Sequence, residues 1–250
     1  MSNKKVGHTF LASLGKTRLR PGGIEATDWL MDQAEISEDD YVLEVACNMG
    51  TTLIEVAQTY HCKMVGVDLD SQALKKAQFA IDAANLENLV TVQQGNAMKL
   101  PFKDNTFDLV INEAMLTMLA QTAKEKALLE YYRVLKPGGK LLTHDISLKN
   151  EDPEQLDHLS HIINMRVAPL TKRMWQSLYQ QIGFQNIASQ TGEMSLMSPR
   201  GMIRDEGFTG TARIIKNGLK QENREQFLSM FRYFRNQRDN LQYIVNCAEK

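Results

Sequence analysis

The chain has 250 residues, 43% hydrophobic and 24% charged, a composition typical of a globular protein with a full core. Its 29 basic and 30 acidic residues give a formal charge of −1, so global charge does not indicate a nucleic-acid or membrane surface as partner. No run approaches the ~18–20 apolar residues of a membrane span, and residues 1–8 lead into no secretory signal. Three scattered cysteines predict no disulfide framework and no structural zinc site, which favours a reducing, cytoplasmic setting.

The first half of the chain alternates between strand and helix patterns. Residues 1–36 form an expected helical lead-in, or lid, with a breaker at 21–23 and a helix over 26–36. Short apolar runs then predict strands at 41–45, 64–68, 90–93, 107–112 and 140–146, with helices at 51–58, 71–84 and 121–135. Strands that alternate with helices predict a parallel sheet covered on both faces, which is the doubly wound α/β fold.

After residue 150 the pattern becomes less regular. Helices are expected at 152–164 and 171–182, a strand within 184–197 and a last strand at 241–246, which makes seven, mostly parallel strands in total. Residues 200–238 read as a helical insertion before the last strand, where Phe227, Met230, Phe231 and Phe234 form an apolar packing face. The main domain would then comprise 37–199 and 239–250.

The stretch from Glu44 to Thr52 follows a strand and opens a helix. Ala46, Asn48 and Gly50 are small or tolerate left-handed backbone, so the chain there can approach a ligand closely. Asp68 ends the next strand, about 24 residues beyond Glu44, where an acid can accept hydrogen bonds from ribose hydroxyls. A dinucleotide fingerprint needs three glycines in the pattern Gly-x-Gly-x-x-Gly, and Gly50 alone remains here, so a ligand without a pyrophosphate is favoured.

Five ordered segments resemble the motifs of class I S-adenosylmethionine-dependent methyltransferases, especially the small-molecule type of ubiquinone and menaquinone biosynthesis. They are Glu44-x-Ala46-x-Asn48-x-Gly50, Gly66-Val67-Asp68-Leu69-Asp70, residues 94–102, Phe107-Asp108-Leu109-Val110 and residues 133–139 (RVLKPGG). Ala46 and Asn48 replace two family glycines, and Asn96 replaces the usual acid. The resemblance covers roughly residues 40–147 and implies a Rossmann-like fold and methyl transfer from S-adenosylmethionine to a small-molecule acceptor. S-adenosylhomocysteine would be the product, and no metal is expected.

The same resemblance implies a cofactor site. Glu44 and the turn after it would face the methionine moiety, Asp68 would bind the ribose and Leu69 would cover the adenine. Asn96 and the amide of Ala97 would reach the adenine edge. The complete expected set is Glu44, Ala46, Asn48, Gly50, Thr51, Asp68, Leu69, Asn96, Ala97, Met98 and Asn112.

Two residues are candidates for chemistry at the carboxyl edge of the sheet, where such folds place ligands. Glu113 directly follows the fourth strand and is the first candidate, as a base or as a substrate anchor. His144, at the end of the fifth strand, is the second. His144 and Asp145 are adjacent on a strand and should face opposite sides, so one of the two should face the cleft.

Two other functions fit parts of the sequence. The basic surface expected over 213–238 would suit an RNA methyltransferase, although the near-zero net charge argues against nucleic acid as partner. The altered first motif would also suit a cofactor-binding protein without catalysis. In the lead-in, Arg18 and Arg20 are candidates for closing over the cofactor, and the sequence predicts no particular oligomeric state.

Overall fold

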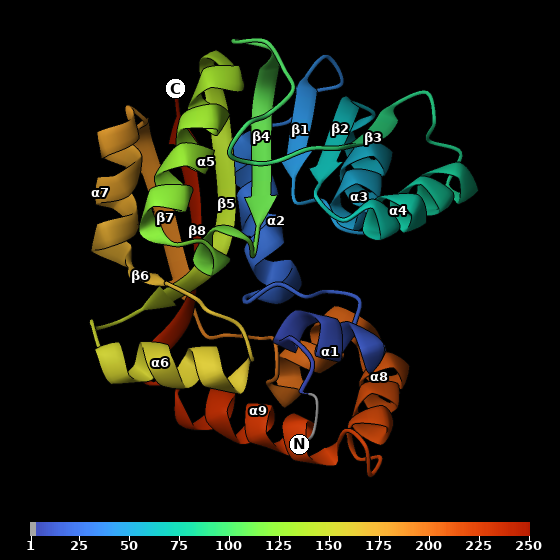
Figure 1. The fold of residues 1–250 in the computed structure, drawn as a ribbon. Helices are drawn as coiled ribbons and strands as arrows, with labels where there is room; N and C mark the ends of the chain where they lie inside the picture. The colour runs from blue at the N-terminus through green and yellow to red at the C-terminus, as the bar shows by residue number, and fades with distance from the viewer. Residues whose placement is uncertain (1–3) are drawn as a thin grey trace.

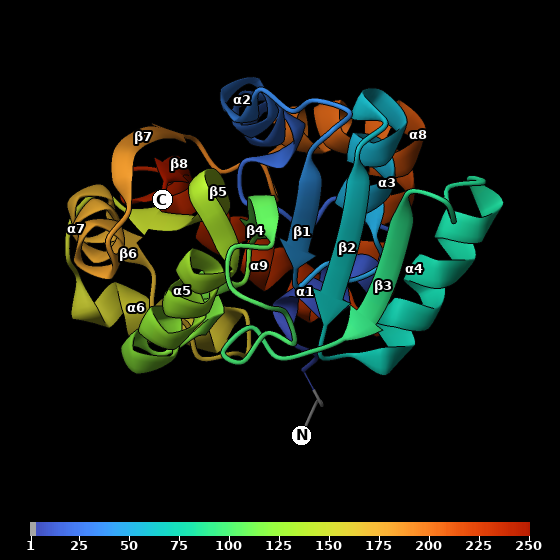
Figure 2. The ribbon, with the colours of Figure 1, turned by 90° about the horizontal axis from the view of Figure 1, so that it is seen from above.

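The computed structural model describes residues 4–250, so the first three residues of the expected lead-in lie outside the described residues. Within this part of the chain, one mixed sheet runs in the order β3-β2-β1-β4-β5-β8-β7, and a short strand β6 pairs with β5 (Figures 1 and 2). The strands are β1 (Tyr41–Val45), β2 (Lys63–Asp68), β3 (Val90–Gln94), β4 (Phe107–Glu113), β5 (Leu135–Leu148), β6 (Leu170–Thr171), β7 (Gln185–Gly192) and β8 (Leu241–Glu249). β1 to β5 are parallel, and β8 is antiparallel to both of its neighbours, β5 and β7. The predicted doubly wound, mostly parallel α/β fold is confirmed.

Two layers of helices cover the two faces of this sheet. The sheet-covering helices are α2 (Gly23–Ala34), α3 (Thr51–Tyr60), α4 (Ser71–Ala83), α5 (Gln121–Val134) and α7 (Lys172–Ile182). One apolar core joins α5 and α7 to the sheet, with Tyr131 and Trp175 fully buried in it. A second core joins α2, α3 and α4 to the other face, where Leu30, Leu53 and Ile81 are fully buried. The apolar stripes of these helices thus face the sheet, as amphipathic spacing predicts.

Four further helices and the chain around them form a separate layer, called here the helical cap. They are α1 (Gly7–Ser13), α6 (Pro153–Ile162), α8 (Pro199–Gly218) and α9 (Arg224–Asn236), and they lie together in the lower part of Figure 1. The cap has its own apolar core, in which Phe10, Leu159, Ile214 and Met230 are buried. Among helices of residues 4–250, none combines the length and the apolarity that a membrane crossing requires.

Several boundaries differ from the sequence prediction for local reasons. β5 begins at Leu135 rather than Lys140, because Leu135 pairs with Phe107 and the Pro-Gly-Gly stretch remains within the strand, with Gly138 at φ 77°. β6 was not predicted, since a strand of two residues carries no apolar alternation. In α8, Gly207 has a non-helical conformation (φ 69°, ψ 177°) that kinks the helix. A short 3-10 helix, η1 (Leu116–Met118), follows β4.

Candidate active site

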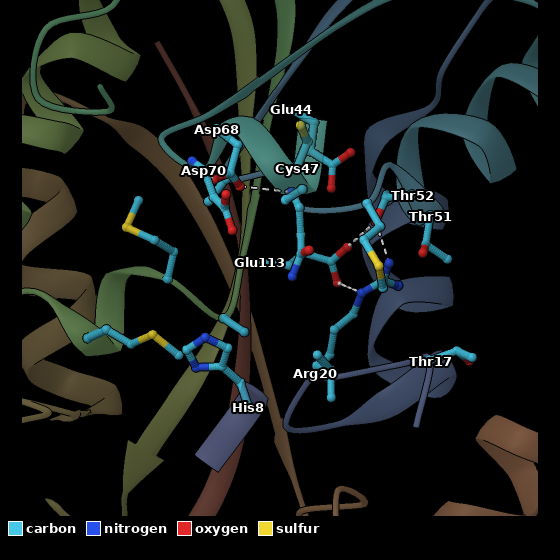
Figure 3. A pocket seen from close by; sticks show the side chains of 18 residues that line it. His8, Thr17, Arg20, Glu44, Cys47, Thr51, Thr52, Asp68, Asp70 and Glu113 are labelled. Atoms are coloured by element: carbon cyan, nitrogen blue, oxygen red, sulfur yellow. Dashed lines mark hydrogen bonds and ion pairs between the residues drawn. The ribbon is translucent and has the colours of Figure 1, made fainter. Parts of the chain in front are cut away.

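A cavity of about 250 Å³ lies at the carboxyl ends of β1, β2 and β4. Its sheet side consists of Glu44, residues 46–49, Thr51, Thr52, Asp68, Asp70, Ala73 and residues 113–115, with Met118 beside them (Figure 3). Its other side consists of His8 from α1 and of Thr17, Leu19 and Arg20. These last three belong to residues 14–22, which connect α1 to α2 and are called here the strap. The sheet edge therefore forms one wall of the cavity, and the strap forms part of the opposite wall.

The turn after β1 has the left-handed backbone that its residue types predict. Ala46, Asn48 and Gly50 all have positive φ, at 61°, 49° and 77°. The amide of Gly50 donates to the carbonyl of Cys47 at 2.9 Å, and the amide of Cys47 donates to Val67 of β2 at 3.1 Å. The turn is therefore a compact, locally bonded element that brings backbone to the cavity wall.

Asp68 is held at the cavity by the same turn. Its Oδ2 accepts a hydrogen bond from the amide of Asn48 at 2.9 Å, and its Oδ1 accepts one from the amide of Asp70 at 2.8 Å. Asp70 in turn caps α4 by accepting from the amide of Gln72 at 2.8 Å. Two backbone donors thus orient the carboxylate of Asp68 before any ligand is bound.

Glu44 is a buried carboxyl group with an open hydrogen-bonding position. Its Oε2 is buried and has no hydrogen-bond partner within residues 4–250. Burial, followed by the nearby charge of Glu113, raises the pKa of Glu44 to about 8. A buried acceptor without a partner is costly, so a cationic or hydrogen-donating ligand in the cavity would complete this site.

Glu113 is the centre of a buried polar network that joins the sheet to the strap. Its Oε2 lies 3.3 Å from Nε of Arg20 and 3.0 Å from Nδ1 of His144. Thr27 donates to Oε2 at 2.9 Å, Thr52 donates to Oε1 at 3.2 Å, and Arg20 also donates to both threonine hydroxyls. Burial favours the neutral acid, but Arg20 and the His144 hydrogen bond outweigh it and lower the pKa of Glu113 to about 2.

His144 is fully buried and has both ring nitrogens in hydrogen bonds. Its Nε2 accepts from the amide of Gly22 in the strap at 2.9 Å, so Nδ1 carries the proton and donates to Glu113. Burial lowers the pKa of His144, which keeps the ring neutral. Asp145 faces the other side, as alternation predicts, and accepts from the amide and hydroxyl of Thr117 at 2.7 and 2.8 Å.

The other predicted cofactor residues lie outside the lining of this cavity. Leu69 is exposed at the end of β2, and Asn96 to Met98 follow β3 in a turn in which Asn96 Oδ1 accepts from the amide of Met98 at 2.9 Å. Gly50 is the N-cap residue of α3 and does not line the cavity. Asn112 is fully buried and donates to the carbonyl of Val45 at 2.8 Å, so it joins β4 to β1. The structure thus gathers Glu44, Ala46, Asn48, Thr51, Asp68 and Glu113 at the cavity.

The sequence did not predict the three side chains that surround Glu113, namely those of Arg20, Thr27 and Thr52. For Arg20 the sequence predicts only that it belongs to a lead-in that closes over a ligand, and 93 positions separate it from Glu113. A short sequence motif cannot predict a contact between two residues so far apart in the chain. Within the described part of the chain, no three His, Cys, Asp or Glu side chains are grouped to hold a metal ion.

Comparison with known proteins gives three relevant matches besides a family model. The family described as "Methyltransferase domain" matches residues 42–139. A Haemophilus influenzae chain described as "Uncharacterized protein" is 54% identical over an alignment of 251 positions that covers 100% of both chains. The demethylmenaquinone methyltransferase of Lactiplantibacillus plantarum is 34% identical over 158 residues, 62% of this chain and 64% of that enzyme, so the match spans less than two thirds of the relative.

A solved structure extends the likeness of fold to the whole chain. It is phosphoethanolamine N-methyltransferase 2 of Haemonchus contortus in complex with S-adenosyl-L-methionine, with a TM-score of 0.77 and 18% identity. The superposition covers 98% of this chain and 56% of the other. At this identity the likeness concerns the fold alone, and it includes the cap as well as the sheet.

Proposed function

Because the chain belongs to the class I S-adenosylmethionine-dependent methyltransferases, we propose that its cavity binds S-adenosylmethionine and that it methylates a small-molecule acceptor. The observation that carries this proposal is the pairing of two carboxyl groups on either side of the turn after β1. Asp68 is oriented by two backbone amides, and Glu44 keeps a buried oxygen without a partner within residues 4–250. A ligand with ribose hydroxyls and an ammonium group satisfies both.

The residues at this sheet edge fit the parts of that cofactor. Glu44 would accept from the ammonium of the methionine moiety, beside the backbone of residues 46–51. Asp68 would accept from the ribose hydroxyls. Leu69 and the turn at 96–98 follow the neighbouring strands β2 and β3, and the side chain of Gln94 donates to the carbonyl of Leu69 at 2.9 Å. The exposed side chain of Leu69 and the amides of the turn at 96–98 would then contact the adenine.

S-adenosylmethionine supplies an electrophilic methyl group on a sulfonium, which becomes a neutral thioether once the methyl is lost. The task left to the chain is to align the acceptor, to exclude water and to receive a proton where the acceptor has one. The strap covers the cavity, and Glu206 of α8 holds it by accepting from the amides of Thr17 and Arg18, each at 3.0 Å. Closure by the strap would exclude water.

The sequence predicts that Glu113 is a base or a substrate anchor, but we favour a third role, in which Glu113 anchors the strap to the sheet through Arg20. Its carboxylate already accepts from Arg20, His144, Thr27 and Thr52, and a group held ionised in this way is a poor proton acceptor near neutral pH. His144 likewise has no free ring nitrogen. We propose that both residues position the strap and the cavity wall, and that they do not exchange a proton with the acceptor.

The proposal is tested by calorimetry and by transfer of label. The purified chain should bind S-adenosylmethionine and S-adenosylhomocysteine at one site with micromolar affinity, and NAD weakly or not at all. Labelled methyl groups should then appear in a small-molecule fraction of a cell extract and not in its RNA. Absence of binding by both sulfur ligands, or label in RNA alone, would overturn the proposal.

Glu113→Gln tests the anchor role through stability. A carboxyl group whose folded pKa is about 2, below its unfolded value, stabilises the fold above pH ~4.5, and this contribution disappears as the pH falls towards 2. We expect the variant to lose about 3 kcal/mol of unfolding free energy at pH 7 and almost nothing near pH 2. Urea denaturation at several pH values measures this, with the exposed Glu87→Gln as control. A constant difference across pH would refute the anchor role.

A further inference from the structure

A second cavity adjoins the first one, beneath the strap. It has a volume of about 60 Å³ and shares His8, Leu19, Ala114 and Met118 with the larger cavity. The rest of its wall comes mainly from the helical cap and the end of β5, with Leu11, Ile146, Ile163, Val167, Met230 and Phe234 among its residues. The two cavities therefore meet at a junction formed by α1, the strap and the segment after β4.

The two cavities differ in charge. Arg20, Glu44, Asp68, Asp70 and Glu113 line the larger one. The described residues that line the smaller one include no Asp, Glu, Lys or Arg, and His8 and Thr117 are its polar side chains. A charged group placed there would lose its hydration without gaining a partner. The volume is that of about five water-sized groups, so the smaller cavity suits a small apolar moiety.

His8 lies at the junction with an unused hydrogen-bonding position. Its Nδ1 is buried and lacks a partner among residues 4–250. Figure 3 shows His8 on the same side of the cavity as Arg20 but apart from the Arg20–Glu113 pair. The position of α1 is fixed, because Gly7 donates to the carbonyl of Ile163 at 2.7 Å and Phe10 is buried in the cap core. Burial lowers the pKa of His8, so its ring is neutral at pH 7 and can accept a proton.

We propose, as an extension that rests on the proposed function, that the smaller cavity holds the apolar group of an uncharged acceptor and that His8 is the base. The acceptor would carry its nucleophilic oxygen, sulfur or nitrogen, with one proton, at the junction of the cavities. The lone pair of that atom forms the bond to the methyl carbon, and the carbon–sulfur electron pair stays on sulfur. The acceptor's proton passes to Nδ1 of His8, which becomes an imidazolium.

The surroundings of His8 favour this role over the other titratable groups. Glu113 and Arg20 are paired with each other, and Asp68 is bonded to two amides. Asp70 caps α4, and Glu44 lies in β1. The cap residues that approach the junction, such as Ile163 and Met230, are apolar. His8 is therefore the group at the junction that has an open acceptor position and a suitable charge state.

Binding is tested by nuclear magnetic resonance with methyl-labelled methionine. The chain is saturated with S-adenosylhomocysteine and titrated with 4-methylphenol, or with 4-hydroxybenzoate as a charged analogue of similar size. We expect 4-methylphenol to shift the methyl signals of Met118 and Met230 but not that of Met64 in the opposite core, and we expect 4-hydroxybenzoate to shift none. Unmoved Met118 and Met230 signals in a chain that binds S-adenosylhomocysteine would refute the inference but not the proposed function. Failure to bind S-adenosylhomocysteine would instead refute the proposed function.

A cavity-filling variant provides a second measurement. Val167→Phe adds bulk to the wall of the smaller cavity, whereas Ile215→Phe adds comparable bulk at an exposed position on α8. We expect Val167→Phe to retain S-adenosylhomocysteine affinity within about 2-fold and to lose the 4-methylphenol shifts. Shifts that persist in Val167→Phe as in Ile215→Phe would place the probe elsewhere and overturn the assignment.

The base is tested with labelled S-adenosylmethionine and two acceptors, 4-methylphenol and 4-methylbenzenethiol. His8→Asn and His8→Gln should bind S-adenosylhomocysteine normally and transfer label about 100-fold more slowly than the wild type. The fall in wild-type rate at acid pH, where His8 is protonated, should be absent from both variants. Undetectable transfer by the wild type to both acceptors, or an unchanged rate and pH profile in the variants, would refute the role of His8.

Discussion

The turn after β1 and the strap line the same cavity, but different kinds of contact hold them. The turn is held by its own backbone, through left-handed residues and hydrogen bonds to β2. The strap is held by side chains distant in sequence, since Glu206 accepts from its backbone and Arg20 pairs with Glu113. Lys16 is also fully buried in the strap, 3.7 Å from Asp205 and 3.4 Å from Glu206.

This difference indicates which wall of the cavity can move. A turn closed by local backbone bonds opens only when the strands beside it separate. A strap held by a few polar side chains opens when those contacts break, and loops over ligand sites are commonly of this low-stability kind. We therefore expect the sheet edge to be the permanent part of the site and the strap to be the part that admits ligands.

The largest expected effect comes from removing the charge that joins the two walls. Arg20→Met leaves Glu113 buried without its main partner, which should lower the unfolding free energy by about 3–5 kcal/mol. Urea denaturation at pH 7 measures the loss. The double variant Arg20→Met/Glu113→Gln has no isolated buried charge, and it should be more stable than Arg20→Met alone. If the single variant were as stable as the wild type, the strap would not depend on this ion pair.

A smaller effect is expected on the sheet wall. Asp68→Ala should weaken S-adenosylmethionine binding about 10-fold, because it removes charge-assisted ribose bonds and frees the amides of Asn48 and Asp70. Calorimetry checks this against Asp82→Ala, which removes an exposed acid from α4. Equal affinities for the two variants would exclude Asp68 from the site.

Protonation of Glu44 should be linked to binding. The free chain has a pKa of about 8 at Glu44, so the group is largely protonated at pH 7, and an ammonium ligand would favour its ionised form. Binding should then release a fraction of a proton, and affinity should rise with pH up to about 8. Calorimetry in phosphate and in Tris buffer gives the proton count. Glu44→Gln, which cannot ionise, should lack this release, and an identical count in both chains would refute the linkage.

The smallest expected effect is local to the strap. Glu206→Gln replaces a charged acceptor by a neutral one, so amides of residues 14–22 should exchange hydrogen about 5-fold faster, with no change in the turn at 46–50. Hydrogen exchange measured by mass spectrometry tests this, with the exposed Glu222→Gln as control. Faster exchange in both segments would contradict the separation between a permanent and a movable wall.

The sequence by itself determined the alternating strands and helices, the left-handed turn at 46–50 and the position of Asp68 at the end of β2. These features arise from local causes, namely apolar periodicity and the conformational range of small residues. The motif resemblance also indicated Glu44, and the position of Glu113 directly after the fourth strand made it a candidate, because the carboxyl ends of these strands meet at one edge.

Only the tertiary structure decided which side chains and backbone groups these residues contact. It paired Arg20 with Glu113, fixed the proton of His144 on Nδ1 through the amide of Gly22, and buried Asn112 between β1 and β4. It also placed His8 at the junction of two cavities. Such contacts join positions tens to more than a hundred residues apart, and their partners depend on how the cap packs onto the sheet. No local pattern in the chain contains that information.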